Sequence, residues 1–115
     1  MSVEIRKTSR ELSKVERYRL TLSPEIKTIQ NLADDTVINV AAFCRFADID
    51  EETGEVSELL GILDPEGNSF VTQSKTFMKS FEDIADIFDD GSEFAIRKIS
   101  GTNKAGRAYV NCVLA

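Results

Sequence analysis

The chain has 115 residues, of which 42% are hydrophobic and 30% charged, and its formal net charge is −6. A chain of this length forms one domain with a modest core, and no apolar run is long enough to cross a membrane. The sequence contains no histidine, no P-loop and no GxGxxG motif, so the commonest general base, the commonest metal ligand and the usual phosphate-binding loops are missing. We therefore expect one cytoplasmic domain over residues 1–115, without catalytic activity, cofactor or metal.

Charge is unevenly distributed along the chain. Between Phe46 and Ser74 there are eight acidic residues and no basic residue. From Phe94 to the end the pattern reverses, and four bases occur without an acid: Arg97, Lys98, Lys104 and Arg107. Such segregation permits a local positive groove on an acidic body.

The first element that we expect is a short helix in an N-terminal extension, residues 1–30, packed on the rest of the domain. Ser13 and Glu16 have the spacing of a capping box. Three apolar residues follow at helical spacing: Val15, Tyr18 and Leu22. A strand stays open as an alternative, because Tyr18, Leu20 and Leu22 also alternate. We favour the helix and expect it to end at Ser23-Pro24.

The segment Thr36–Ala47 is apolar and β-branched, which predicts a long strand. One side of this strand is apolar and indicates core: Ile38, Val40, Ala42, Cys44 and Phe46. The other side is mixed: Val37, Asn39, Ala41, Phe43 and Arg45. Because side chains alternate between the faces of a strand, we expect Phe43 and Arg45 to face outward. We expect Cys44 and Cys112 to be buried, reduced thiols.

A hairpin and a helix follow. Residues 55–64 and 69–74 predict two strands around a tight turn at Asp64–Asn68. Residues 75–90 predict the clearest helix, which ends at Gly91 and whose apolar stripe is Phe77, Phe81, Ile84 and Phe88, reinforced by Met78 and Ile87. Five acids on this helix indicate a solvent face or an acidic docking surface: Glu82, Asp83, Asp86, Asp89 and Asp90.

The chain closes with a second hairpin. Its loop "SGTNKAG" is either a finger that closes Lys104 over a nucleic-acid backbone or an ordinary hairpin loop that uses glycine for positive φ. If the apolar residues of the last strand face the core (Ala108, Val110, Cys112 and Leu114), the alternate set faces solvent: Arg107, Tyr109, Asn111 and Val113. The order strand, hairpin, helix, hairpin predicts a mainly β, α+β domain. We expect a small OB-fold-like barrel of five strands with one major helix between strands 3 and 4.

Outward aromatic rings beside basic residues suit single-stranded nucleic acid. Nucleobases stack on aromatic rings, and the side chains of lysine and arginine neutralise the phosphates. A second interpretation is that Phe43 and Tyr109 cover a small second core under the N-terminal segment. From the residues alone this second interpretation is favoured, since single exposed rings are common.

Three stretches resemble a known family: "NLADDTVINVAAFCRF", "LGILDPEGNSFVTQSKTFMKSFEDIADIF" and "FAIRKISGTNKAGRAYVNCVLA". The shared patterns are an aspartate turn before the long strand, "SKT" at the helix entrance, and a G-T-x-x-x-G loop before an aromatic-bearing last strand. Residues 31–115 thus resemble the single-stranded-DNA-binding proteins of protein-primed Bacillus phages and their relatives in Gram-positive phages and mobile elements.

This resemblance implies an OB-like barrel that coats displaced single strands during replication, with little sequence preference and no chemistry. It implies roles for Lys75, Lys104 and Tyr109, and it favours the interpretation in which the rings are exposed. Together with the strand alternation, it gives a candidate nucleic-acid-binding set: Phe43, Arg45, Phe70, Lys75, Arg97, Lys104, Arg107, Tyr109 and Asn111.

The leading hypothesis is therefore a single-stranded-DNA-binding protein of phage or mobile-element replication, with replication proteins as further candidate partners and no membrane association. The rival is a protein-interaction adaptor that uses its acidic surface and binds no nucleic acid. A third hypothesis is a carboxylate-metal nuclease.

Overall fold

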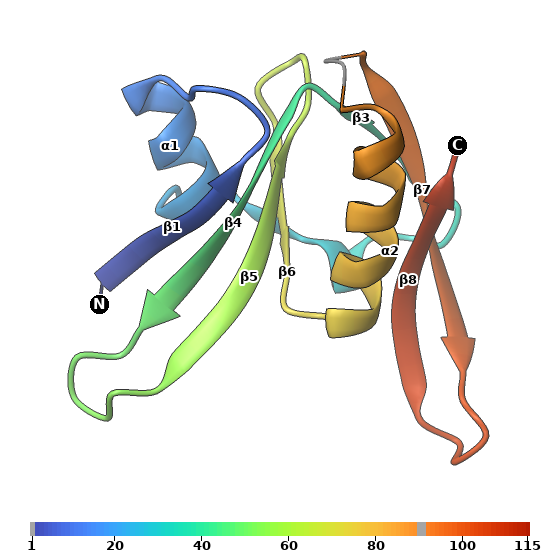
Figure 1. Ribbon diagram of the computed structural model, residues 1–115. Coiled ribbons are helices and arrows are strands. Elements are labelled where there is room, and N and C mark those ends of the chain that lie inside the picture. The colour runs from blue at the N-terminus through green and yellow to red at the C-terminus, as the bar shows by residue number, and fades with distance from the viewer. Residues whose placement is uncertain (1, 90–91) are drawn as a thin grey trace.

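The computed structural model describes residues 2–89 and 92–115, in which eight strands form two sheets and two α-helices pack against them (Figure 1). The larger sheet has the order β1 (Ser2–Thr8), β4 (Ala42–Ile49), β5 (Val56–Leu63), β6 (Ser69–Thr72), β2 (Lys27–Thr28). The smaller sheet has the order β3 (Val37–Val40), β7 (Phe94–Thr102), β8 (Ala108–Leu114). The helices are α1 (Lys14–Thr21) and α2 (Lys75–Ile87), with a 3-10 turn η1 at Ile29–Asn31. Neither α-helix is long and apolar enough to span a bilayer.

The predicted α+β class is confirmed, whereas the strands of residues 2–89 and 92–115 form no closed barrel. In a closed barrel of this chain order, β6 and β8 would lie side by side. Here the short strand β2 pairs in parallel with β6 and occupies that edge. The carbonyl of Val110, which lies on β8, accepts a hydrogen bond from the hydroxyl of Ser74 at 3.1 Å. The N-terminal segment therefore completes one sheet, and the two sheets stay separate.

The long strand predicted at residues 36–47 is two strands that belong to different sheets. The chain changes sheet at Ala41, whose N–H bonds the carbonyl of Leu63 at 2.9 Å. β3 pairs with β7, while β4 pairs with β1 and β5. Both faces of β4 are consequently covered. Phe43 belongs to the core around α2, whereas Cys44 and Phe46 belong to a second core that includes Leu20 of α1.

The main core lies between the two sheets and is filled by α2 (Figure 1). Phe77 and Phe81 are fully buried, and Met78 is 4% exposed, so the predicted stripe is confirmed at these positions. Ile87 is 76% exposed and does not belong to the stripe. The helix ends at Ile87 with Phe88 as its C-cap residue. The predicted stop at Gly91, like Asp90 of the acidic face, lies outside the described residues.

The predicted N-terminal helix is confirmed, and its start is the capping box. The Ser13 hydroxyl accepts from the Glu16 N–H at 3.1 Å, and the Glu16 carboxylate accepts from the Ser13 N–H at 2.9 Å. The guanidinium of Arg10 also donates to both oxygens of Glu16, at 3.0 and 2.6 Å. These bonds, led by that from Arg10, lower the pKa of Glu16 from 4.5 to about 2.

This shift predicts an acid-dependent loss of stability. Because the folded state depresses the pKa of Glu16, the stabilisation is present above about pH 4.5 and disappears as the pH falls toward 2. We expect Glu16→Gln to lower the free energy of unfolding at pH 7, by an amount that shrinks below pH 4.5 and is lost as the pH falls through about 2. Urea unfolding at several pH values measures this difference, with Glu11→Gln as the control. A difference that stays constant with pH contradicts the assignment.

Candidate nucleic-acid interface

The smaller sheet buries one face and leaves the other open. Ile38, Ile96 and Cys112 are at most 3% exposed and pack toward α2. The residues that alternate with them form what we call the outer sheet face: Val37, Asn39, Ala95, Arg97, Ile99, Gly101, Tyr109, Asn111 and Val113. On it Val37, Tyr109 and Val113 are 48%, 38% and 40% exposed. The predicted parity of the last strand is thus confirmed at Tyr109 and Cys112.

Tyr109 lies flat on this face because its cross-strand partner is a glycine. Tyr109 pairs with Gly101 of β7. A Cβ at Gly101 would lie 2.4 Å from the phenol oxygen and 2.9 Å from a ring carbon of Tyr109. The ring therefore occupies the space that any other residue would fill, and its remaining surface is open to solvent. A ring fixed in this way is a preorganised stacking platform.

Arg97 and Asn111 lie on the same face as Tyr109. Arg97 pairs with Val113 on one side and Val37 on the other, and Asn111 pairs with Ile99. The Asn111 side-chain oxygen accepts from the N–H of Cys112 at 2.9 Å, and among residues 2–89 and 92–115 its amide nitrogen has no hydrogen-bond partner and can donate to a ligand. Within the described part of the chain, Arg97 forms no ion pair. The face therefore combines a ring, an amide donor and an uncompensated cation.

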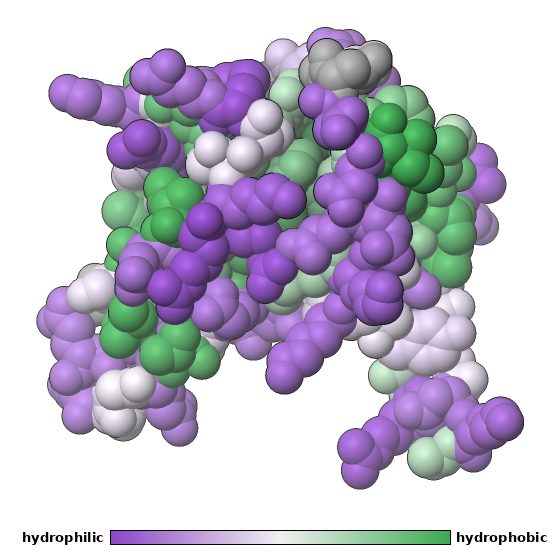
Figure 2. Space-filling view, viewed as in Figure 1, coloured by the Kyte–Doolittle hydropathy of each residue, from purple (hydrophilic) through white to green (hydrophobic). Residues whose placement is uncertain are grey.

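The β7–β8 loop extends this face with two more cations. The carbonyl oxygen of the Asn103 side chain accepts from the N–H groups of Ala105 and Arg107 at 2.9 and 3.0 Å, and Gly106 has a φ of 80°. The loop is thus an ordered hairpin turn that presents Lys104 and Arg107, both exposed, rather than a free finger. Figure 2 shows its tip projecting from the body as a mainly hydrophilic surface.

Two predicted stacking residues are buried instead. Phe43 is 9% exposed, because α2 covers that side of β4. Its ring packs edge to face on the ring of Phe81, with 4.9 Å between the ring centroids. Phe70 is 8% exposed, and the ammonium of Lys27 lies 5.6 Å from its ring centroid, because β2 adds to β6 there. The expectation that these rings face solvent is wrong, and neither can stack a base without unfolding its surroundings.

Two predicted phosphate contacts lie elsewhere. Arg45 is half-buried and forms an ion pair with Glu82 of α2, so its charge is already compensated. Its predicted outward position is therefore wrong. Lys75 is exposed at the first residue of α2, next to Ser74 and hence beside the free edge of β8 rather than on the outer sheet face. Of the nine candidates, the structure brings five together: Arg97, Lys104, Arg107, Tyr109 and Asn111.

Lys98 shows why a count of basic residues overstates the positive surface. It is 3% exposed, and its ammonium donates to the carbonyls of Leu32 and Gln30 and lies 3.5 Å from Asp34. Lys98 thus joins the segment after η1 to the sheet, and it presents no charge to a ligand.

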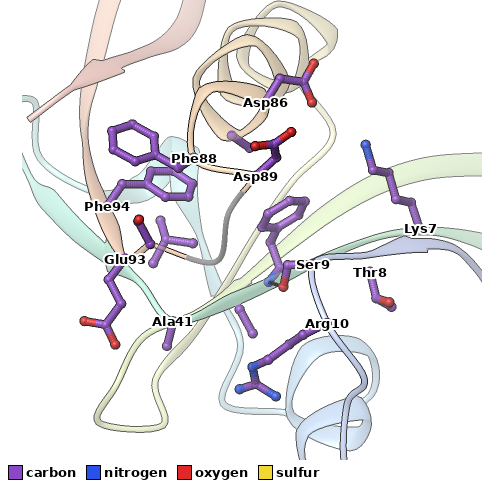
Figure 3. Close-up of a pocket in the computed structure, with 15 residues that line it drawn as sticks. Lys7, Thr8, Ser9, Arg10, Ala41, Asp86, Phe88, Asp89, Glu93 and Phe94 are labelled. Atoms are coloured by element: carbon purple, nitrogen blue, oxygen red, sulfur yellow. Dashed lines mark hydrogen bonds between the residues drawn. The ribbon is translucent and has the colours of Figure 1, made fainter.

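A cavity of about 220 Å³ lies between β1, β4 and the C-terminal end of α2. Its apolar wall includes Phe43, Phe88 and Phe94, of which the last two stack at 5.0 Å. Figure 3 shows Lys7 across the cavity from Asp86 and Asp89. This mixed rim repels phosphate as much as it attracts it, so the cavity does not extend the outer sheet face.

The remaining chemistry of the described residues is limited. Burial raises the pKa of Cys44 to about 11 and that of Cys112 to about 12, so both thiols are protonated at neutral pH. No group of three acidic or cysteine side chains among residues 2–89 and 92–115 is arranged to hold a metal ion.

Comparison with known proteins adds no identification: no protein family, curated protein or solved structure was found that matches the chain. The resemblance to the phage proteins stays a prediction from the residues that carry it.

Proposed function

We propose that this protein binds single-stranded DNA on the outer sheet face, without catalysis and with little sequence preference. The observation that supports it best is the position of Tyr109, which lies flat over Gly101 on an open sheet face that also carries Arg97 and Asn111. Stacking of one base on such a ring contributes about 1–3 kcal/mol for any base. Lys104 and Arg107 then lie at the end of the face where the backbone of a bound strand continues.

Charge favours a single strand over a duplex. The outer sheet face contains no acidic residue, whereas the chain as a whole carries a net charge of −6. A flexible single strand of DNA can run along the outer sheet face from Arg97 to Lys104 and Arg107 in the loop. A duplex is wider and brings phosphates close to the acidic body, which repels it.

The chain order also supports an OB-like origin for the fold. We propose an OB-like barrel that is left open between β6 and β8. The strand pairs β4–β5, β5–β6, β3–β7 and β7–β8, with α2 between β6 and β7, support this relationship. The open edge then results from the insertion of β2 beside β6.

Tyrosine fluorescence provides the test of binding. The chain has two tyrosines and no tryptophan. Tyr18 lies on α1, and in the Tyr18→Phe variant all tyrosine fluorescence comes from Tyr109. We expect oligothymidine to quench this fluorescence at low salt. If the fluorescence does not change and a labelled oligomer does not bind, the proposal is wrong and the adaptor hypothesis is favoured. Cleavage of the oligomer that depends on Mg²⁺ would favour the nuclease hypothesis.

The strength of binding is expected to fall with salt in proportion to the number of phosphate contacts. Three cations, Arg97, Lys104 and Arg107, predict a slope of log K against log salt of about −2 for a single strand. Lys104→Ala should reduce the slope by about 0.7. The control is Lys79→Ala, since Lys79 is exposed on α2 and lies outside the outer sheet face. Equal effects of the two variants would contradict the placement.

A further inference from the structure

Helix α1 exposes an apolar stripe on the side away from its buried residue. Leu20 is fully buried, whereas Val15, Tyr18 and Leu22 are 59%, 51% and 55% exposed. Val15 and Tyr18 lie on α1 and Leu22 is its C-cap residue, and their spacing of three and four residues places them on the same side. We call these three residues the α1 strip. Exposed apolar side chains that gather in this way mark an interaction site more often than single ones do. Basic residues edge the strip, with Lys14 and Arg17 along one side and Arg19 along the other.

The C-terminal half of α2 has the complementary character. Ile87 is 76% exposed. Three exposed acids lie near it in the sequence: Asp83 and Asp86 on α2, and Asp89 just beyond the C-cap residue Phe88. Asp83 forms an ion pair with Lys79 at 3.3 Å, so the acidic character of this end depends mainly on Asp86 and Asp89. Figure 2 shows apolar surface at this end of α2, next to a hydrophilic area along the helix. An apolar strip with basic edges thus occurs on one helix, and an apolar side chain with acidic neighbours on the other. Opposite charge at the rim of a small apolar contact selects the partner and its orientation.

One molecule cannot join its own two surfaces. α1 packs on the face of β4 that carries Cys44, and α2 packs on the opposite face, which carries Phe43 (Figure 1). The exposed strip of α1 and the exposed end of α2 therefore point away from each other. A contact between them requires two copies of the chain.

We propose that the α1 strip of one copy docks on the acidic end of α2 of a second copy. The two surfaces are different patches, so the contact is head-to-tail and leaves a free patch at each end of every pair. Repetition of the contact builds an open row of molecules. Neither patch includes a residue of the outer sheet face, so each copy in a row keeps that face free.

The contact is small and is expected to be weak in free solution. Each patch offers one to three apolar side chains, whereas stable interfaces bury roughly 1,200–2,000 Å². Two copies bound next to each other on one DNA strand meet at a high effective concentration, so a weak contact is enough to hold them together. This step rests on the proposed function. The contact would then make the coating of long DNA strands cooperative.

Charge reversal tests the contact without nucleic acid. The first variant, K14E with R17E, reverses one edge of the α1 strip; the second, D86K with D89K, reverses the acidic surface and leaves the Lys79–Asp83 ion pair intact. The altered side chains are exposed, so both variants are expected to fold, as circular dichroism can verify. Sedimentation at low salt and up to about 1 mM protein, where a contact with a Kd of about 1 mM becomes visible, should show association of the wild type. Each variant alone should be monomeric, and an equimolar mixture should associate again.

The outcomes separate this inference from the proposed function. A monomeric wild type, a variant that associates as the wild type does, or a mixture that stays monomeric overturns the α1–α2 contact. With DNA, both variants should bind an oligothymidine too short for two copies as the wild type does, and lose only the cooperativity on a long one. Association of the mixture without any DNA binding would leave the contact standing and remove the proposed function.

Discussion

Tyr109→Ala is expected to weaken the binding of oligothymidine about 5- to 150-fold and to leave the melting temperature nearly unchanged. The expected range corresponds to one stacked base, or about 1–3 kcal/mol. Stability should change little because the ring lies on the solvent side of the sheet, over Gly101, and is 38% exposed. Fluorescence anisotropy of a labelled oligomer measures the affinity, and thermal unfolding measures the stability.

Tyr109→Phe is the matched control, since it keeps the ring and removes only the hydroxyl. It should bind within a few-fold of the wild type. If Tyr109→Ala instead lowers the melting temperature strongly and binds as before, the ring serves packing and the outer sheet face is not a stacking surface.

Phe43→Ala is expected to produce the opposite result. Truncation of a buried phenylalanine costs about 3–5 kcal/mol, and small domains are stable by only about 5–15 kcal/mol. Phe43 is 9% exposed and contacts the ring of Phe81 at 4.9 Å, so the variant should lose much of its stability. Urea unfolding monitored by circular dichroism gives the free energy.

The milder variant Phe43→Leu separates stability from binding. It keeps most of the apolar volume, so enough folded protein should remain for a titration. We expect its affinity per folded molecule to equal that of the wild type. A stable Phe43→Leu protein that binds oligothymidine much more weakly would show that the ring contacts the strand, against its buried position.

Local patterns predicted the helices well. Ser13 and Glu16 form the capping box that their spacing indicates, and Phe77 and Phe81 are the buried stripe of α2. These features depend on residues three or four apart, which are neighbours on any helix. The parity of β8 was equally predictable, because side chains in a strand alternate whatever the sheet pairs with. Leu114, which is 52% exposed, shows that parity alone does not fix burial at a strand end.

The position of Phe43 could not be predicted by the same reasoning. Alternation along residues 36–47 correctly separates Phe43 from Cys44, but it assumes that one face is open. The chain changes sheets at Ala41, and each face of β4 is then covered by a different helix. That arrangement depends on contacts between residues far apart in sequence. The predicted N-terminal helix gave no signal for it, because the apolar residues at helical spacing, Val15, Tyr18 and Leu22, are exposed, and the residue that packs on β4 is Leu20.

The first strand was missed because its sequence carries no clear pattern. β1 pairs with β4 along its length, yet Glu4, Arg6 and Lys7 are exposed and only Val3 and Thr8 are half-buried. Main-chain hydrogen bonds with an already formed strand hold it, and these leave no trace in the side chains. The two-residue strand β2 likewise has no recognisable sequence pattern, although it pairs with β6 and forms the edge of the larger sheet.

The most direct test of the proposed interface is a map of amide chemical shifts in ¹⁵N-labelled protein as oligothymidine is added at low salt. We expect the shifts to change along β7, β8 and their loop, with the largest changes at Gly101, Tyr109 and Asn111, and the changes to disappear with added salt. Changes confined to α1, to the cavity at the end of α2 or to the acidic turn between β4 and β5 would contradict the proposed interface.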